Sequence, residues 1–252
     1  MQITFCAPGL AYSIDSILLF QTEETGNWWK DSLYCFYPQL DRRRMEQTAK
    51  SEQEAYLREA LSDIYQQAAR EIGEKKEAYQ AHWENNRQAV EDALGDIFRT
   101  PLVGRFQNVW ANITLNPICP RFLAERRFDL FYRNSPQGAL GMALHELVHF
   151  LWFDRWNALF HDDPAEYEAP HLKWIFSEMA VKPILGEPRL AERNPYYPGN
   201  CVYEYFETMT AGGKPVMETM EKIFAGNDID HFMLEGYRYC QEHEAEICCQ
   251  IQ

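Results

Sequence analysis

The chain has 252 residues, of which 46% are hydrophobic and 25% are charged, so wholesale disorder and fibrous repeats are excluded. Its 24 Lys and Arg residues against 38 Asp and Glu residues give a net charge of −14 at pH 7. Because so acidic a surface repels phosphate backbones and anionic lipid heads, we expect neither nucleic acid nor a membrane surface as a partner.

The N-terminal segment is predicted to begin with a β-strand over Gln2–Cys6, which is short, apolar and followed by a Pro-Gly pair. Met1–Phe20 does not resemble a secretory signal, because no basic residue precedes its apolar part and Asp15 interrupts that part. No apolar run approaches the roughly 18 residues of a membrane helix. We therefore expect a cytoplasmic protein, with its seven cysteines as reduced thiols.

Two amphipathic helices are predicted between Asp41 and Arg99, where proline is absent and Glu, Gln, Ala, Lys and Arg dominate. Apolar residues recur there every three or four positions, at Leu57, Leu61, Ile64, Ala68 and Ile72. The second helix is predicted over Glu74–Phe98. We expect both helices to pack on the main domain as a lid or support. A coiled-coil arm is the rarer alternative, because the apolar repeat is too short for many heptads.

A period of two between Gly104 and Arg133 predicts two half-buried strands. The first strand places Val109, Ala111, Ile113 and Leu115 on one face, and the second repeats the pattern at Phe128, Leu130 and Tyr132. Both strands precede the most informative segment of the chain.

That segment, Gly138–Phe153, is apolar almost all round, which predicts a helix through the middle of the core. Asp162-Asp163-Pro164 signals the start of another helix, which carries Leu172–Leu185 and which Pro170 either kinks or restarts. Two further helices are predicted near Pro215–Phe224 and Asp228–Cys249.

The buried helix contains the motif His145-Glu146-Leu147-Val148-His149. Residues four apart lie on one face of a helix, so both imidazoles can reach a single ion. Glu146 is rotated by roughly 100°, so it suits a general base for water better than a third ligand. A chain of this composition would contain about 0.02 such motifs by chance. The alternative is two core histidines that are satisfied by ordinary hydrogen bonds.

This motif resembles the active-site helix of the zincin metallopeptidases. The resemblance implies an α+β, mainly helical fold: a zincin-like core with a small sheet and an active-site helix, plus an N-terminal helical portion. We place the N-terminal portion at residues 1–100 and the catalytic core at residues 101–252. In zincins an edge strand pairs with the substrate backbone, and here Gly104–Asn116 or Phe128–Arg133 could play that part.

The third metal ligand sorts the zincin subgroups. The metzincin continuation, a glycine and a third histidine, is absent after His149. Gluzincins take a glutamate from a later helix, and the candidates are Glu166, Glu168 and Glu178. Glu178 is favoured, because it lies in an otherwise apolar helix where an unpaired carboxylate would be penalised. An ion pair with Lys182 is its bland alternative, and His171 could serve as a ligand or a nearby donor.

The resemblance implies a zinc-dependent peptidase that acts on peptide or protein substrates. His145, His149 and Glu178 would bind one Zn²⁺ ion, and Glu146 would be the general base. Gluzincins usually supply a Tyr or His to stabilise the oxyanion, and we place His231 in this catalytic role, with Tyr203, Tyr205 and Tyr237 as the alternatives. The alternative function is a zincin-fold metal-binding protein with a regulatory or partner-binding role and no turnover. No pattern in the sequence indicates an oligomeric state.

Overall fold

The structure is a computed structural model, and it describes residues 1–22, 25–102 and 104–251. The expected α+β, mainly helical class is confirmed. The strands are β1 (Ile3–Cys6), β2 (Val109–Thr114), β3 (Arg121–Phe122), β4 (Arg127–Phe131), β5 (Thr210–Ala211) and β6 (Lys214–Pro215). The helices are α1 (Leu10–Leu18), α2 (Asn27–Phe36), α3 (Arg42–Gln47), α4 (Lys50–Phe98), α5 (Pro136–Phe160), α6 (Leu172–Leu185), α7 (Pro188–Ala191), α8 (Glu204–Thr208), α9 (Val216–Phe224), α10 (Ile229–Glu242), α11 (Glu244–Cys248) and the 3-10 turn η1 (Pro164–Tyr167).

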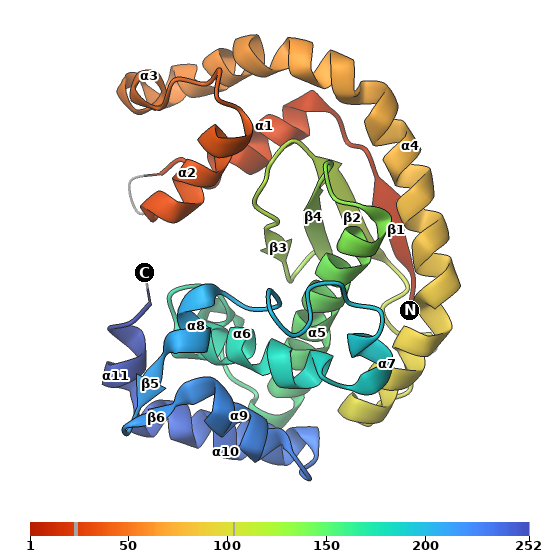
Figure 1. Cartoon of the computed structure of the whole chain (residues 1–252), viewed down its shortest axis with the longest axis vertical. Helices are drawn as coiled ribbons and strands as arrows, with labels where there is room; N and C mark the ends of the chain where they lie inside the picture. The colour runs from red at the N-terminus through yellow and green to blue at the C-terminus, as the bar shows by residue number, and fades with distance from the viewer. Residues whose placement is uncertain (23–24, 103, 252) are drawn as a thin grey trace. The chain divides into compact units, whose positions relative to one another are not determined.

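The chain forms two compact units, each assembled from two stretches. The first unit comprises Met1–Asn85 and Phe106–Ala139, and the second comprises Asn86–Arg105 and Leu140–Gln252. The first unit contains a four-stranded sheet with the order β1-β2-β4-β3, shown in Figure 1. β1, β2 and β4 run parallel, and β3 pairs antiparallel with β4. The three strands predicted from the sequence are therefore confirmed, but β2 and β4 are buried on both faces over most of their length, so the prediction that they are half-buried is wrong.

The two strands named above as candidate substrate-pairing edges lie inside this sheet. β2 is flanked by β1 and β4, and β4 is flanked by β2 and β3, so the prediction that either is an edge strand is wrong. Helix α4 covers the edge at β1. The Gln80 side chain there accepts a hydrogen bond from the Phe5 N–H at 3.2 Å and donates one to the Ile3 carbonyl at 3.1 Å. This amide occupies the hydrogen-bonding groups that an added strand would use.

Helix α4 is one continuous helix of 49 residues, so the prediction of two helices is wrong. Gly73, near the expected break, is exposed and lies within the helix. A single glycine costs a helix about 1 kcal/mol relative to alanine. Apolar side chains on both sides of it are buried, among them Leu61, Ile72 and Trp83. Burial of these side chains outweighs the cost of the glycine, so the helix continues.

A buried polar cluster joins α1 to the sheet of the first unit. Asp129 of β4 is fully buried and accepts hydrogen bonds from the Ser16 hydroxyl at 2.6 Å and the Tyr12 hydroxyl at 2.8 Å. Burial raises the pKa of Asp129 to about 6, although Ser16 and Arg127 favour the charged form. The cluster fixes α1 on the sheet and contains a carboxyl group that is costly to ionise.

Aromatic side chains form the core of the second unit. Trp152 of α5 contacts Phe176 of α6, with ring centroids 5.0 Å apart, and Phe232 of α10 at 5.8 Å. Phe176 and Phe232 also contact one another at 5.6 Å. The predicted core helix is confirmed as α5, which extends beyond both expected ends. The three rings fix how α5, α6 and α10 pack.

The segment between α5 and α6 differs from the prediction. The helix expected after Asp162-Asp163-Pro164 is only the turn η1, in which the Asp163 carboxylate accepts a hydrogen bond from the Ala165 N–H. The helix restarts at Leu172. The predicted helix over Asp228–Cys249 is divided at His243 into α10 and α11.

All seven cysteines are free thiols. None of the described helices has both the length and the apolar character that crossing a bilayer requires.

Candidate metal centre

Helix α5 carries the His-Glu-x-x-His motif through the core of the second unit. Its buried residues cover all sides, so the motif's polar side chains lie among apolar ones. His149 is fully buried, Glu146 is 4% exposed, and the His145 side chain is 18% exposed. Placing these three groups in the core is costly unless they are paired or bind a ligand.

Helix α6 supplies the third member of the site. Glu178 is 2% exposed and lies on α6 two residues after Phe176, whose ring packs against Trp152 of α5. Trp152 in turn lies three residues after His149. This aromatic contact fixes the two helices so that the carboxylate faces the two imidazoles.

The three side chains converge on one point. The Nε2 atoms of His145 and His149 lie 3.1 Å apart. Glu178 faces both imidazoles, with Oε2 at 3.3 Å from His145 Nε2 and Oε1 at 3.3 Å from His149 Nε2. One donor atom from each residue can be chosen so that all three lie within 4.8 Å of one another. This buried His-His-Glu group could hold a metal ion.

A backbone carbonyl orients the first histidine. His145 Nδ1 lies 3.2 Å from the Cys201 carbonyl oxygen, which can only accept a hydrogen bond. Nδ1 therefore donates to this carbonyl, and Nε2 faces Glu178 and His149. Histidines that bind metals commonly use the second ring nitrogen in this way.

The electrostatics of the group favour a charged carboxylate. Burial opposes ionisation of Glu178, but the facing imidazoles of His149 and His145 outweigh burial and hold its pKa well below the usual value. Lys182, the alternative ion-pair partner, instead bonds Glu207 at 2.6 and 2.7 Å. The alternative ion pair between Glu178 and Lys182 is therefore not formed, and Glu178 contacts the two histidines instead.

The other candidate ligands lie on the surface. Glu166 is exposed and pairs with Lys173 at 2.5 Å, and Glu168 is exposed in the turn that follows η1. His171 is exposed at the N-cap of α6. The cluster that could hold a metal ion contains Glu178 and none of these three residues.

The candidate oxyanion donors occupy different places. His231 is exposed in the first turn of α10, where its backbone N–H donates to Asp228 at 2.8 Å. Tyr237 packs into the aromatic core against Trp156, with ring centroids 4.9 Å apart. Neither is tied to the triad by a described contact, so the site as described does not include them.

Tyr205 is the candidate that responds to the triad. Burial raises the pKa of Tyr205, and the negative charge of Glu178 raises it further. Its ring stacks on Tyr203 at 5.4 Å with 4° between the ring planes, and Tyr203 contacts Trp174 of α6 at 6.3 Å. The sequence placed His231 in the catalytic set, whereas Tyr205 is the candidate whose pKa responds to the charge of Glu178.

The Cys201 carbonyl was missed by sequence reasoning. Every residue carries a carbonyl, and this one is 56 positions from His145, so no side-chain pattern could indicate it. The only available signal was the Pro/Gly/Asn-rich composition of the preceding loop over residues 186–200, which predicts irregular backbone with carbonyls outside helices.

Comparisons with protein-family models, with curated proteins and with solved structures found no match to this chain.

Proposed function

We propose that the protein is a zinc-dependent peptidase with a zincin-like catalytic core of gluzincin type. This proposal rests on the cluster that His145, His149 and Glu178 form in the core. Glu146, which lies between the two histidines in the sequence, is also buried. Three residues of α5 and one residue of α6 would thus supply the ligands and base that hydrolysis by activated water needs.

The spacing of the donors suits zinc. Zinc bonds of about 2.0–2.2 Å in tetrahedral geometry correspond to donor separations of about 3.3–3.6 Å. The separations are 3.1 Å between the imidazole nitrogens and 3.3 Å from each nitrogen to a different oxygen of Glu178, and with one donor atom per residue all three atoms lie within 4.8 Å. Two imidazoles and a carboxylate form a donor set that is typical of catalytic zinc, which keeps one further position for water.

When bound, zinc supplies a Lewis acid that polarises the substrate carbonyl and acidifies water. Glu146 would take a proton from the attacking water and deliver it to the leaving amine. The Cys201 carbonyl would hold His145 in the tautomer that presents Nε2. Tyr205, kept protonated by its raised pKa, would donate a hydrogen bond to the oxyanion in preference to His231.

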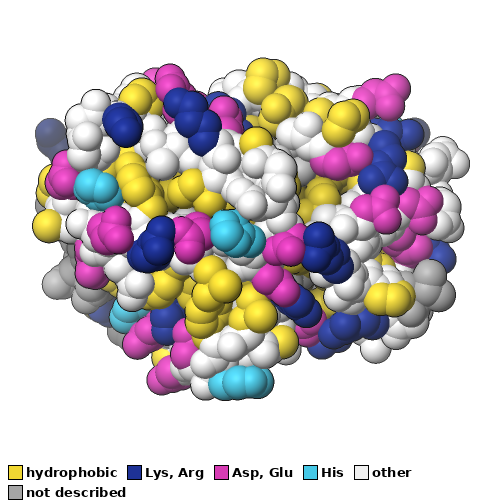
Figure 2. Space-filling view, turned by 90° about the horizontal axis from the view of Figure 1, so that it is seen from below, with side chains coloured by type: hydrophobic (Ala, Val, Ile, Leu, Met, Phe, Trp, Pro, Cys, Tyr) yellow, Lys and Arg dark blue, Asp and Glu magenta, His cyan; other side chains and the backbone are white. Residues whose placement is uncertain are grey.

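The surface charge gives little guidance about the substrate. On the face shown in Figure 2, acidic and basic side chains are interspersed, with hydrophobic side chains between them. The net charge of −14 is therefore not gathered into one acidic patch on that face. We propose peptides or proteins as substrates because of the site chemistry.

The test is turnover of a mixed peptide library by the zinc-loaded protein. Wild type should cleave the library, and Glu146→Gln should lose at least about 100-fold in rate because it removes the base. Zinc content should stay the same in this variant. Glu192→Gln is the matched control, since Glu192 is exposed and outside the triad. Equal cleavage by Glu146→Gln would reject the proposed base.

Absence of cleavage would point to the alternative function. Wild type that holds zinc but leaves the library intact would favour a metal-binding protein with a regulatory or partner-binding role. The two outcomes are separated by measuring zinc and turnover on the same sample.

A further inference from the structure

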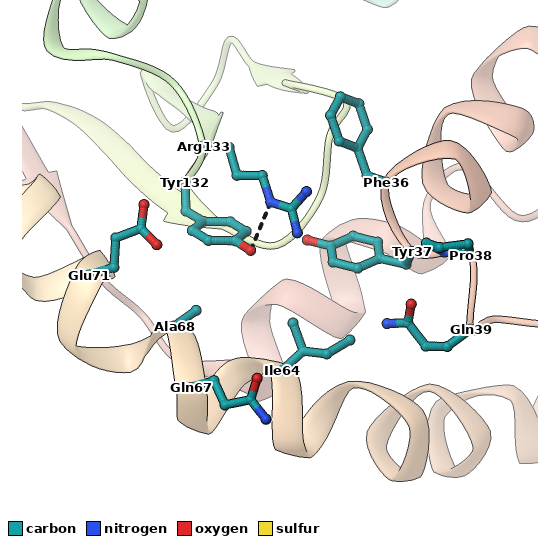
Figure 3. A pocket seen from close by; sticks show the side chains of 10 residues that line it. All are labelled: Phe36, Tyr37, Pro38, Gln39, Ile64, Gln67, Ala68, Glu71, Tyr132 and Arg133. Carbon is teal, nitrogen blue, oxygen red and sulfur yellow. Dashed lines mark hydrogen bonds between the residues drawn. The ribbon is translucent and has the colours of Figure 1, made fainter.

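A second candidate ligand site lies in the first unit and uses none of the metal-centre residues. A cavity of about 360 Å³ is lined by the end of α2 and the residues after it, by one face of α4 and by the two residues that follow β4 (Figure 3). Its walls include the rings of Phe36 and Tyr132, the amides of Gln39 and Gln67, and the charged groups of Glu71 and Arg133.

Arg133 is the cationic group of this cavity. Its guanidinium carbon lies 5.5–6.0 Å from the centroids of four aromatic rings, those of Phe36, Tyr37, Phe131 and Tyr132. Its Nε–H donates to the Tyr132 hydroxyl at 2.9 Å, as Figure 3 shows. Across residues 1–22, 25–102 and 104–251, no carboxylate lies within ion-pair distance of this guanidinium. The rings hold the cation without neutralising it.

The remaining donors of Arg133 form a flat fork. Four N–H groups sit on its two terminal nitrogens, and this arrangement matches the two oxygens of a carboxylate. The amides of Gln39 and Gln67 add further donors, and both side chains are exposed. Phe36, which is 42% exposed, offers an apolar ring beside the fork.

Glu71 sets the limit on ligand charge. Its carboxylate lines the same cavity, and its ion-pair partner, Lys75, lies 4.0 Å away. A ligand with two negative charges would be repelled by Glu71, whereas a single carboxylate can lie against Arg133. We propose that the cavity binds a small organic monocarboxylate with a flat apolar body, the carboxylate on Arg133 and the body against Phe36 and Tyr132.

The first test varies the ligand and keeps the full chain unchanged. Phenylacetate is titrated by ligand-observed NMR, with phenylacetamide as its uncharged counterpart and inorganic phosphate as a compact anion. The titration is run with and without EDTA, so that carboxylate bound at a metal ion is recognised. Phenylacetate should bind saturably under both conditions, and phenylacetamide should bind at least about tenfold more weakly.

Each of the following results would overturn the proposal. They are equal binding of phenylacetate and phenylacetamide, phosphate binding as tight as that of phenylacetate, and no saturable phenylacetate binding up to about 20 mM. A signal that EDTA abolishes would also reject it, since the ligand would then be bound through a metal.

The second test varies the protein. Arg133→Gln should weaken phenylacetate binding by at least about tenfold. Arg126→Gln is the matched control, because Arg126 is also stacked on an aromatic ring, that of Phe106 at 4.7 Å, but lies outside the cavity. Phe36→Ala, at an exposed position, should weaken phenylacetate severalfold and leave acetate unaffected, even if Arg133→Gln fails to fold. Unchanged phenylacetate binding in either folded variant would contradict the assignment.

Discussion

Asp129 makes the stability of the protein depend on pH in a direction opposite to that of a paired surface carboxylate. Its pKa is about 6 in the folded protein, against 3.8 for an ordinary Asp. The folded state therefore holds a proton that the unfolded chain releases at lower pH, so stability falls as the pH rises from about 4 to about 6. Each pKa unit corresponds to about 1.4 kcal/mol, so the loss is about 3 kcal/mol in total.

Asp129→Asn removes the ionisation and retains the size of the side chain. Any hydrogen bond lost to Ser16 or Tyr12 is lost at every pH, so it cancels when the variant is compared across pH. Urea unfolding followed by circular dichroism should show the variant gaining about 3 kcal/mol on wild type between about pH 4 and about pH 7. A difference in the free energy of unfolding between variant and wild type that stays constant within about 0.5 kcal/mol over this range would refute the raised pKa of Asp129.

Packing and backbone contacts give further predictions. Gly73→Ala should raise the free energy of unfolding by about 0.5–1 kcal/mol, because a methyl group at that helical position meets no atom within 4 Å. Gly236→Ala should lower it by about 1–3 kcal/mol, because the added carbon would lie 2.5 Å from the Phe176 ring, and equal effects in the two urea titrations would contradict this packing. Gln80→Leu should lower the free energy of unfolding by about 1–3 kcal/mol, because it leaves the edge of β1 without its two hydrogen bonds. Gln88→Leu is the control: it breaks one surface hydrogen bond to Asp92 and should lower the free energy of unfolding by less than half as much. Hydrogen exchange of the β1 amides should accelerate only in the Gln80 variant, and exchange that is unchanged there would show that the edge is protected by other groups.

The candidate metal centre could be predicted from local sequence because each of its members differs from the apolar pattern around it. His145 and His149 interrupt an apolar helix at the spacing of one turn, and Glu178 interrupts another apolar helix. Burial makes such polar groups costly, so their shared location follows from physical chemistry before any coordinates are known. The bounds of α6, from Leu172 to Leu185, followed equally from local signals.

Features that depend on distant contacts could not be predicted. The continuity of α4 through Gly73 is decided by burial on both sides, which local propensity does not report. The interior positions of β2 and β4 depend on pairing with β1 and with the two residues of β3, far away in the sequence. The role of the Cys201 carbonyl depends on the path of a loop, and the aromatic cage around Arg133 joins α2, its following loop and β4.

The central claim is that His145, His149 and Glu178 hold one zinc ion while Glu146 holds none. Zinc per chain, measured by plasma mass spectrometry on protein purified without added metal, tests it directly. We expect about one equivalent in wild type and in Glu146→Gln, and less than about a tenth in His149→Ala and Glu178→Ala. Wild type with less than about a tenth of an equivalent and no rise in Tm on adding zinc would contradict the account. A full equivalent retained by Glu178→Ala would contradict the proposed third ligand.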